Sequence, residues 1–274
     1  MNKISYTTLA CPEWDIAKII TVAQENRYDG IDFRGYLGSV DIDTDEHFKG
    51  RSLKEIVARV ADSGLEVSCL SSSAKMTAVD EKARIQSLDS VKRFAELCHA
   101  FNCGQIRIFG GASKGVADPV ANAAETLVQA SAVGVDAEVQ IAVETHDDWT
   151  DSALLRKAFV EAGWPENTGF LWDLHHPFRF HGEKPEFTLA NLGERLINTH
   201  WKDSLLPEGG DLALKLCGEG DVPLAACYQA LRNAKYDGWI TFEWEKKWHP
   251  EIETPEIAVP QFARFIGRLR EKEN

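Results

Sequence analysis

Short apolar runs alternate along the chain with longer segments in which apolar residues recur at every third or fourth position. Runs of about four to eight apolar residues are typical of buried strands, and the longer period is typical of helices with one buried face. No low-complexity linker or change of composition interrupts the series. The pattern therefore predicts one continuous series of alternating strands and helices.

This alternation predicts eight strands and a set of helices between them. Eight repeats of strand then helix predict a closed parallel barrel. An open doubly wound sheet normally has fewer strands and a glycine-rich phosphate turn after the first, and no such turn follows Thr8. We expect a single (β/α)8 TIM barrel domain spanning residues 1–274, with strands near 4–8, 30–34, 66–70, 105–109, 139–144, 170–173, 196–200 and 239–243, and helices that include 15–25, 53–63, 81–101, 120–135 and 255–270.

Composition and charge narrow the partners that this barrel is expected to have. The formal net charge of -13 would repel a phosphate backbone, so nucleic acid is not expected as a partner. No run approaches the roughly 20 apolar residues needed to cross a membrane, and no export signal is evident. The six cysteines lack paired C-x-x-C spacing, which fits a reducing compartment. A cytoplasmic protein is expected, and the sequence leaves a homo-oligomer open.

Ionisable residues end the last four predicted strands. Reactive groups on α/β barrels come from the C-terminal ends of strands, and these four runs end in Glu144, Asp173, His200 and Glu243. Their spacing is close to one strand–helix unit, so the four side chains should converge. Two Glu, one Asp and one His suit a hard or borderline divalent ion, with substrate in the open positions. The competing interpretation is a set of ordinary solvated loop acids and a capping histidine.

Several motifs carry a resemblance to a known family: Val143-Glu-Thr-His146, Asp173-Leu-His-His176, His200-Trp-Lys-Asp203, Gly218-Glu-Gly-Asp221 and Tyr236-Asp-Gly238 leading to Glu243. With them the whole chain resembles the xylose isomerase-like barrels. This group comprises sugar phosphate isomerases and epimerases, and it includes inosose dehydratases, ketose 3-epimerases and endonuclease IV.

The resemblance implies that the metal ligands are Glu144, Asp173, His200 and Glu243, and that both Glu face the reacting carbon. The implied ion is most often Mn²⁺, with Mg²⁺, Co²⁺ or Zn²⁺ as alternatives. Endonuclease IV needs further histidines on earlier strands. At the corresponding places this chain has three serines (71–73) and Phe-Gly-Gly (109–111), and none of them is a histidine. That departure and the acidic charge argue against DNA repair.

Three further residues lie close to the predicted ligands in sequence. His176 follows Asp173 by three residues, and in related epimerases a histidine so placed contacts a substrate oxygen. His146 lies two residues beyond Glu144, on the same side if the strand continues, where it can contact substrate or support the ligand. Lys202 stands in the same relation to His200, and we expect it to donate a proton or to steady an enolate oxygen.

Two cations and one aromatic residue complete the predicted site. Arg34 and Arg107 come from the second and fourth strands, where they can bind a substrate oxygen or phosphate, or neutralise an acidic site. Trp201 follows His200 directly and is expected to stack on a sugar ring. The segment 218–221 is interpreted as a loop or as a cap for a helix starting near Val222.

The leading hypothesis is a metal-dependent isomerase or epimerase of a small carbohydrate or cyclitol. A metal-bound enediolate would form by proton transfer between substrate and the catalytic residues Glu144, Glu243 and Lys202. Loss of a hydroxyl from the same intermediate would be dehydration, so an inosose-type dehydratase is the alternative enzyme. A non-catalytic sugar-binding barrel and a hydrolase using an activated water also remain open.

Overall fold

Eight parallel strands close into a barrel in the computed structural model, which describes residues 2–271. Each strand pairs with the next along the chain, and the last pairs with the first: Ile4 of β1 lies opposite Ile240 of β10. This closure confirms the predicted single TIM-barrel domain. The barrel strands are β1 (Ile4–Thr7), β2 (Gly30–Phe33), β3 (Glu66–Lys75), β4 (Gln105–Phe109), β5 (Gln140–Glu144), β6 (Thr168–Asp173), β7 (Leu196–Trp201) and β10 (Trp239–Phe242).

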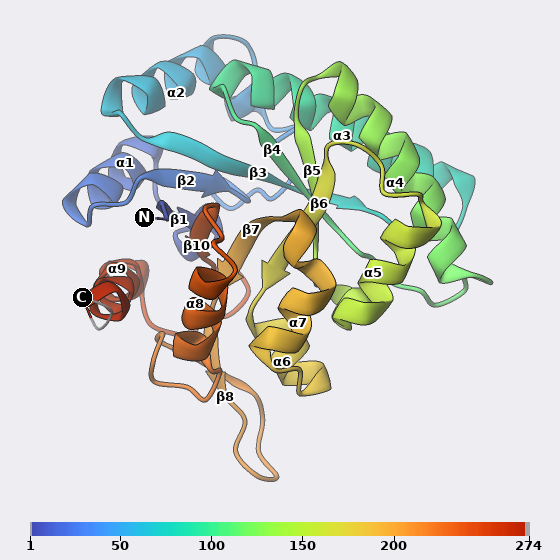
Figure 1. Ribbon diagram of the computed structural model, residues 1–274. Helices are drawn as coiled ribbons and strands as arrows, with labels where there is room; N and C mark the ends of the chain where they lie inside the picture. The colour runs from blue at the N-terminus through green and yellow to red at the C-terminus, as the bar shows by residue number, and fades with distance from the viewer. Residues whose placement is uncertain (1, 272–274) are drawn as a thin grey trace.

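Helices surround the ring of strands, as Figure 1 shows. Four of them begin after an aspartate whose carboxylate accepts a hydrogen bond from a backbone N–H of the first turn, which satisfies an otherwise unpaired donor. The α-helices are α1 (Ile16–Glu25), α2 (Gly50–Ser63), α3 (Glu81–Phe101), α4 (Pro119–Asp136), α5 (Ser152–Glu161), α6 (His175–His181), α7 (Pro185–Leu192), α8 (Leu224–Asn233) and α9 (Pro255–Glu271), and the 3-10 turns are η1 (Thr8–Ala10), η2 (Glu46–Phe48), η3 (Asp147–Trp149) and η4 (Gly193–Arg195).

The predicted elements agree with the observed ones except at a few ends. β3 continues to Lys75, which pairs with Phe109 after an irregularity in the register. The connection from β7 to β10 also contains a two-stranded antiparallel hairpin that was not predicted, formed by β8 (Asp203–Leu205) and β9 (Ala213–Lys215). In Figure 1 this hairpin extends away from the ring of strands. None of the helices within residues 2–271 combines the length and apolar character needed to cross a membrane.

The inside of the barrel is polar, whereas the space between strands and helices is filled by apolar side chains. Small polar residues point inward from several strands, and each finds a partner on another strand. Hydrogen bonds join Ser68 to Ser5 (2.9 Å), Ser5 to Thr241 (2.8 Å), Thr241 to Asn198 (3.1 Å) and Asn198 to Gln105 (3.1 Å). These small buried side chains therefore satisfy one another across the barrel, as buried polar groups generally do.

Candidate metal centre

Three of the predicted ligands meet at the C-terminal ends of the barrel strands, here called the mouth. The side chains of Glu144, His200 and Glu243 offer ligand atoms that lie within 4.8 Å of one another, and all three are buried. His200 Nδ1 lies 3.1 Å from Glu144 Oε1 and 3.2 Å from Glu243 Oε1. Side chains alternate along a strand, so His200 on β7 faces the interior together with the residue two positions later.

That residue, Lys202, connects the fourth predicted ligand to the other three. Its Nζ lies 2.7 Å from Asp173 Oδ2 and 2.7 Å from Glu243 Oε2. It also lies 2.6 Å from Oε1 of Glu245, and its side chain is almost fully buried. The carboxylates of Asp173 and Glu243 therefore both contact one ammonium group. The structure thus brings together the four residues that the sequence singled out.

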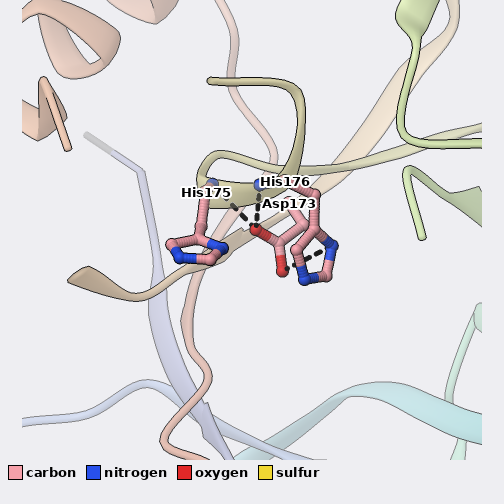
Figure 2. A group of neighbouring side chains, drawn as sticks. All are labelled: Asp173, His175 and His176. Atoms are coloured by element: carbon pink, nitrogen blue, oxygen red, sulfur yellow. Dashed lines mark hydrogen bonds and ion pairs between the residues drawn. The ribbon is translucent and has the colours of Figure 1, made fainter. Parts of the chain in front are cut away.

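A second group of potential ligands surrounds Asp173. Figure 2 shows its carboxylate beside His175 and His176, at the turn from β6 into α6. Asp173 Oδ1 accepts hydrogen bonds from the backbone N–H of His175 (2.8 Å) and His176 (3.2 Å). The Nδ1 of His176 donates to the carbonyl oxygen of Thr145 at 2.8 Å, which leaves its Nε2 with a free lone pair. One oxygen of Asp173 is therefore used in the turn, and Oδ2 faces Lys202.

The charges of this centre stabilise one another. Burial alone would raise the pKa of Glu144, but Arg107 and His200 outweigh that effect and lower this pKa to about 2. Burial would lower the pKa of His200, yet Glu243 and Glu144 raise it well above the ordinary value. The pKa of Lys202 is also raised, because Asp173 and Glu243 outweigh the cost of burial. The carboxylates of Glu144 and Glu243 are therefore held ionised beside cations, whereas burial, which Lys202 only partly offsets, raises the pKa of Asp173 to about 7.

The donor set fits a divalent cation. Within residues 2–271, Glu144 Oε2 and Asp173 Oδ2 are buried without a hydrogen-bond partner, although each makes an ion pair. Carboxylate oxygens and an imidazole nitrogen are ligands that Mn²⁺, Mg²⁺ and Zn²⁺ accept. An ion here would be held by Glu144, Asp173, Glu243 and Nδ1 of His200. This role stays a prediction from the sequence, now with a matching arrangement of side chains.

Asp32 is a buried residue of the centre that sequence reasoning missed. Its Oδ2 lies 3.2 Å from Nε2 of His200, on the opposite side of the imidazole from the two glutamates. When Nε2 donates to a carboxylate, the ring orientation is fixed and Nδ1 is free to bind a metal. The available signal was a carboxylate in the middle of the short apolar strand β2, two residues before Arg34.

We expect Asp32→Asn to weaken Mn²⁺ binding by about 10- to 100-fold, the usual effect of losing a carboxylate behind a ligating histidine. The substitution keeps the shape of the side chain but removes the charge that orients His200. Titration calorimetry of the protein freed of metal measures the effect. Asp62→Asn, on the exposed face of α2, is the control and should leave the affinity unchanged. Unchanged affinity in Asp32→Asn would contradict the positioning role.

Trp201 does not reach the mouth, which corrects the expectation that it stacks on substrate. The ring is fully buried, its Nε1 donates to Thr199 Oγ1 at 2.8 Å, and it packs against Tyr228 of α8 and Phe262 of α9. The alternation of side chains along β7 explains this position, because His200 and Lys202 point inward and the residue between them must point outward. Trp201 belongs to the layer between strands and helices.

The remaining predicted contact residues surround the mouth. The rings of His146 and His176 lie 4.9 Å apart, and His146 also lies 4.4 Å from the ring of Phe109. Arg34 and Arg107 both place their guanidinium groups near Phe109, at 5.4 and 3.8 Å from the ring centre. His146, His176, Arg34 and Arg107 therefore form one cluster with Phe109, and their roles stay predictions.

The segment 218–221 shapes a loop at the edge of the mouth. Asp203 accepts hydrogen bonds from the backbone N–H of Gly218 (2.8 Å), Gly220 (3.0 Å) and Val222 (3.2 Å). A Cβ on Gly220 would lie 2.2 Å from Asp203 Oδ1, so only glycine fits there. These contacts support the structural interpretation of the motif, which organises the chain before α8.

Solved structures with the same fold bind or convert several kinds of small molecule. L-ribulose 3-epimerase superposes with a TM-score of 0.80 at 15% sequence identity, covering 99% of this chain and 95% of the other. The IOLI protein with a bound zinc atom gives 0.78 at 18%, covering 98% of each chain. The "probable 3-DHS dehydratase AsbF" of Bacillus anthracis gives 0.78 at 16%, covering 97% of this chain and 98% of the other. Identities this low show a common fold only.

Sequence comparison identifies the family. No curated protein sequence matches the chain. The family model described as xylose isomerase-like TIM barrel matches residues 20–265, which include every strand of the barrel except β1. The match therefore covers most of the 274 residues and all four predicted ligands. The chain belongs to the xylose isomerase-like TIM barrel family.

Proposed function

We propose that the protein is an isomerase or epimerase of a small sugar or cyclitol that depends on one divalent ion, with Mn²⁺ as the first choice. The observation that carries the proposal is the convergence of Glu144, His200 and Glu243 within 4.8 Å, with Asp173 joined to them through Lys202. Mixed carboxylate and imidazole ligands suit Mn²⁺. A site that only binds sugar has no need for two buried glutamates at a cation.

The two glutamates are placed for proton transfer. The ion, when bound, would polarise the carbonyl of the substrate and make the neighbouring C–H more acidic. Glu144 ends β5 and Glu243 follows β10, and β6 and β7 lie between these strands in the barrel. The two carboxylates therefore reach the centre from different directions. One can remove a proton from carbon while the other returns it to the opposite face.

Lys202 and His176 supply hydrogen bonds to substrate oxygen atoms. The ammonium group of Lys202 stays protonated because Asp173 and Glu243 raise its pKa, so it acts as a donor. The free Nε2 of His176 can accept a hydrogen bond from a hydroxyl group, since Nδ1 already donates to the Thr145 carbonyl. These contacts would fix the substrate so that one C–H bond faces a glutamate.

Deuterium exchange tests the proposal. Ketoses, aldoses and inososes are incubated with the Mn²⁺-loaded protein in deuterated water, and NMR spectra are recorded after the ion is removed. We expect deuterium at a carbon next to a carbonyl, and the product distinguishes epimerisation, isomerisation and dehydration. Protein stripped of metal is the control. Hydrolysis without C–H exchange, or stoichiometric sugar binding without any turnover, would reject the proposal.

The cysteines support a cytoplasmic location. All six are buried and none forms a disulfide: Cys11, Cys69, Cys98, Cys103, Cys217 and Cys227. Free thiols persist in a reducing compartment, whereas exported domains commonly oxidise them.

A further inference from the structure

Arg107 is the least satisfied charged residue of the mouth. It lies on β4, is fully buried, and places its guanidinium carbon 3.8 Å from the centre of the Phe109 ring. Across residues 2–271 none of its three side-chain nitrogen atoms has a hydrogen-bond partner. Among the same residues, its one ion pair joins Nη1 to Glu144 Oε2 at 3.3 Å. A full set of guanidinium donors is therefore buried next to a predicted metal ligand.

Burying a guanidinium group without hydrogen-bond partners costs folding free energy unless a ligand binds to it. A guanidinium has five N–H donors, and burial without hydrogen bonds removes their water without replacement. Neutralising Glu144 needs only a nearby positive charge and does not use the remaining donors. Their planar fork matches the two oxygens of a carboxylate, which would accept two parallel hydrogen bonds.

A second arginine lies close to the first. Arg34 on the β2 side of the mouth is only 5% exposed, and its guanidinium carbon lies 5.4 Å from the same Phe109 ring. Its Nη1 donates to the carbonyl of Val40 at 3.2 Å. Burial and the charge of Arg107 lower the pKa of Arg34 to about 10. The two guanidinium groups repel each other, and the nearby carboxylates of Glu243, Glu144 and Asp32 offset this repulsion and the cost of burial only in part. An anion bound between or beside the two arginines would relieve it further.

We infer that the natural substrate carries a carboxylate close to its reacting carbonyl, and that Arg107 binds this group with help from Arg34. The inference rests on the proposed function and specifies its substrate class as an oxo acid or sugar acid rather than a neutral sugar. The contact between Arg107 and Glu144 places the anionic group within a few bonds of the carbon that Glu144 faces.

Three matched probes separate the possible substrate classes. Dihydroxyacetone, hydroxypyruvate and dihydroxyacetone phosphate share a hydroxymethyl ketone and differ in the remaining substituent, which is neutral, a carboxylate or a phosphate ester. Exchange of the hydroxymethyl C–H is followed by NMR in deuterated water with the Mn²⁺-loaded protein. We expect kcat/KM for hydroxypyruvate to exceed that for dihydroxyacetone by about 10- to 100-fold, as for a charged hydrogen-bonded contact.

Arginine variants show whether that preference comes from the pair. Arg107→Gln and Arg34→Gln should each lower the ratio of hydroxypyruvate to dihydroxyacetone activity towards one, because only the charged probe loses a contact. A residue that merely neutralises Glu144 would change both activities alike and leave the ratio intact, which would overturn the inference. Arg93→Gln, on α3 and paired with Asp43 outside the mouth, is the matched control and should leave the ratio unchanged.

Other outcomes distinguish this inference from the proposed function. Equal exchange of the neutral and carboxylate probes by the wild type would overturn the inference and keep the enolising function. Preference for the phosphate ester would overturn the choice of a carboxylate. If no probe exchanges, calorimetry of hydroxypyruvate binding decides between the two. Weaker binding in both arginine variants than in the wild type would support the anion site and reject the proposed enolising function. Absence of binding as well would reject both.

Discussion

Glu243→Gln is expected to reduce C–H exchange by about 100- to 10,000-fold, and Glu144→Gln should do the same. Glutamine has nearly the same shape as glutamate but cannot accept a proton from carbon, and general-base catalysis contributes about 100- to 10,000-fold. Each variant also replaces a carboxylate at a predicted metal ligand. The rate should therefore be measured at saturating Mn²⁺ by deuterium incorporation.

Glu245→Gln is the matched control for this pair. Glu245 follows β10 two residues after Glu243 and contacts Lys202, but it is not part of the predicted ligand set. Its substitution should cost far less activity. Metal content of all three variants, measured after gel filtration, separates loss of the ion from loss of the base. Wild-type rates in either Glu243→Gln or Glu144→Gln would defeat the assignment.

Lys202→Met is expected to destabilise the metal-free protein by about 3–5 kcal/mol. Removing one partner of a buried ion pair leaves uncompensated charge, and here Asp173, Glu243 and Glu245 would lose their common cation. A divalent ion can replace the missing positive charge. Added Mn²⁺ should therefore stabilise the variant more than it stabilises the wild type, while turnover stays low. Urea unfolding with and without Mn²⁺ measures both quantities.

Lys3→Met provides the comparison for a solvent-exposed pair. Lys3 contacts Glu66 at 2.5 Å with both side chains about half exposed, so its loss should change the free energy of unfolding by less than about 1 kcal/mol. A Lys202→Met variant as stable as Lys3→Met would show that the buried carboxylates do not depend on Lys202. Loss of measurable Mn²⁺ binding in Lys202→Met would contradict the view that the ion is held by the four predicted ligands.

The barrel was predictable because most of its strands contain a short run of buried apolar residues, even though small polar residues face the interior. Apolar periodicity similarly located α1, α3 and α9 with small errors at their ends. The hairpin of β8 and β9 was not predictable, because each of its strands has only three residues, and the loop that follows it is held by contacts of Asp203 to backbone N–H groups 15 and 19 residues away. Such contacts leave no local period.

The convergence of the four predicted ligands was predictable for a related reason: residues that end parallel strands meet at one edge. Asp32 was missed because its partner, His200, is 168 residues away, and nothing near Asp32 in sequence suggests the contact. The error on Trp201 was avoidable. Once His200 and Lys202 are both assigned to the interior, the twofold period of a strand already places Trp201 on the outer face.

The turn that holds Asp173 also limits which ions could occupy the proposed site. One carboxylate oxygen is occupied by two backbone N–H groups, so this aspartate can offer only a single oxygen to a cation. Calcium prefers six to eight oxygen ligands and often takes both oxygens of one carboxylate, whereas magnesium and manganese accept a smaller octahedral shell. If Asp173 is a ligand of the proposed ion, this restricted denticity would discriminate against calcium and would keep coordination positions free for incoming oxygens.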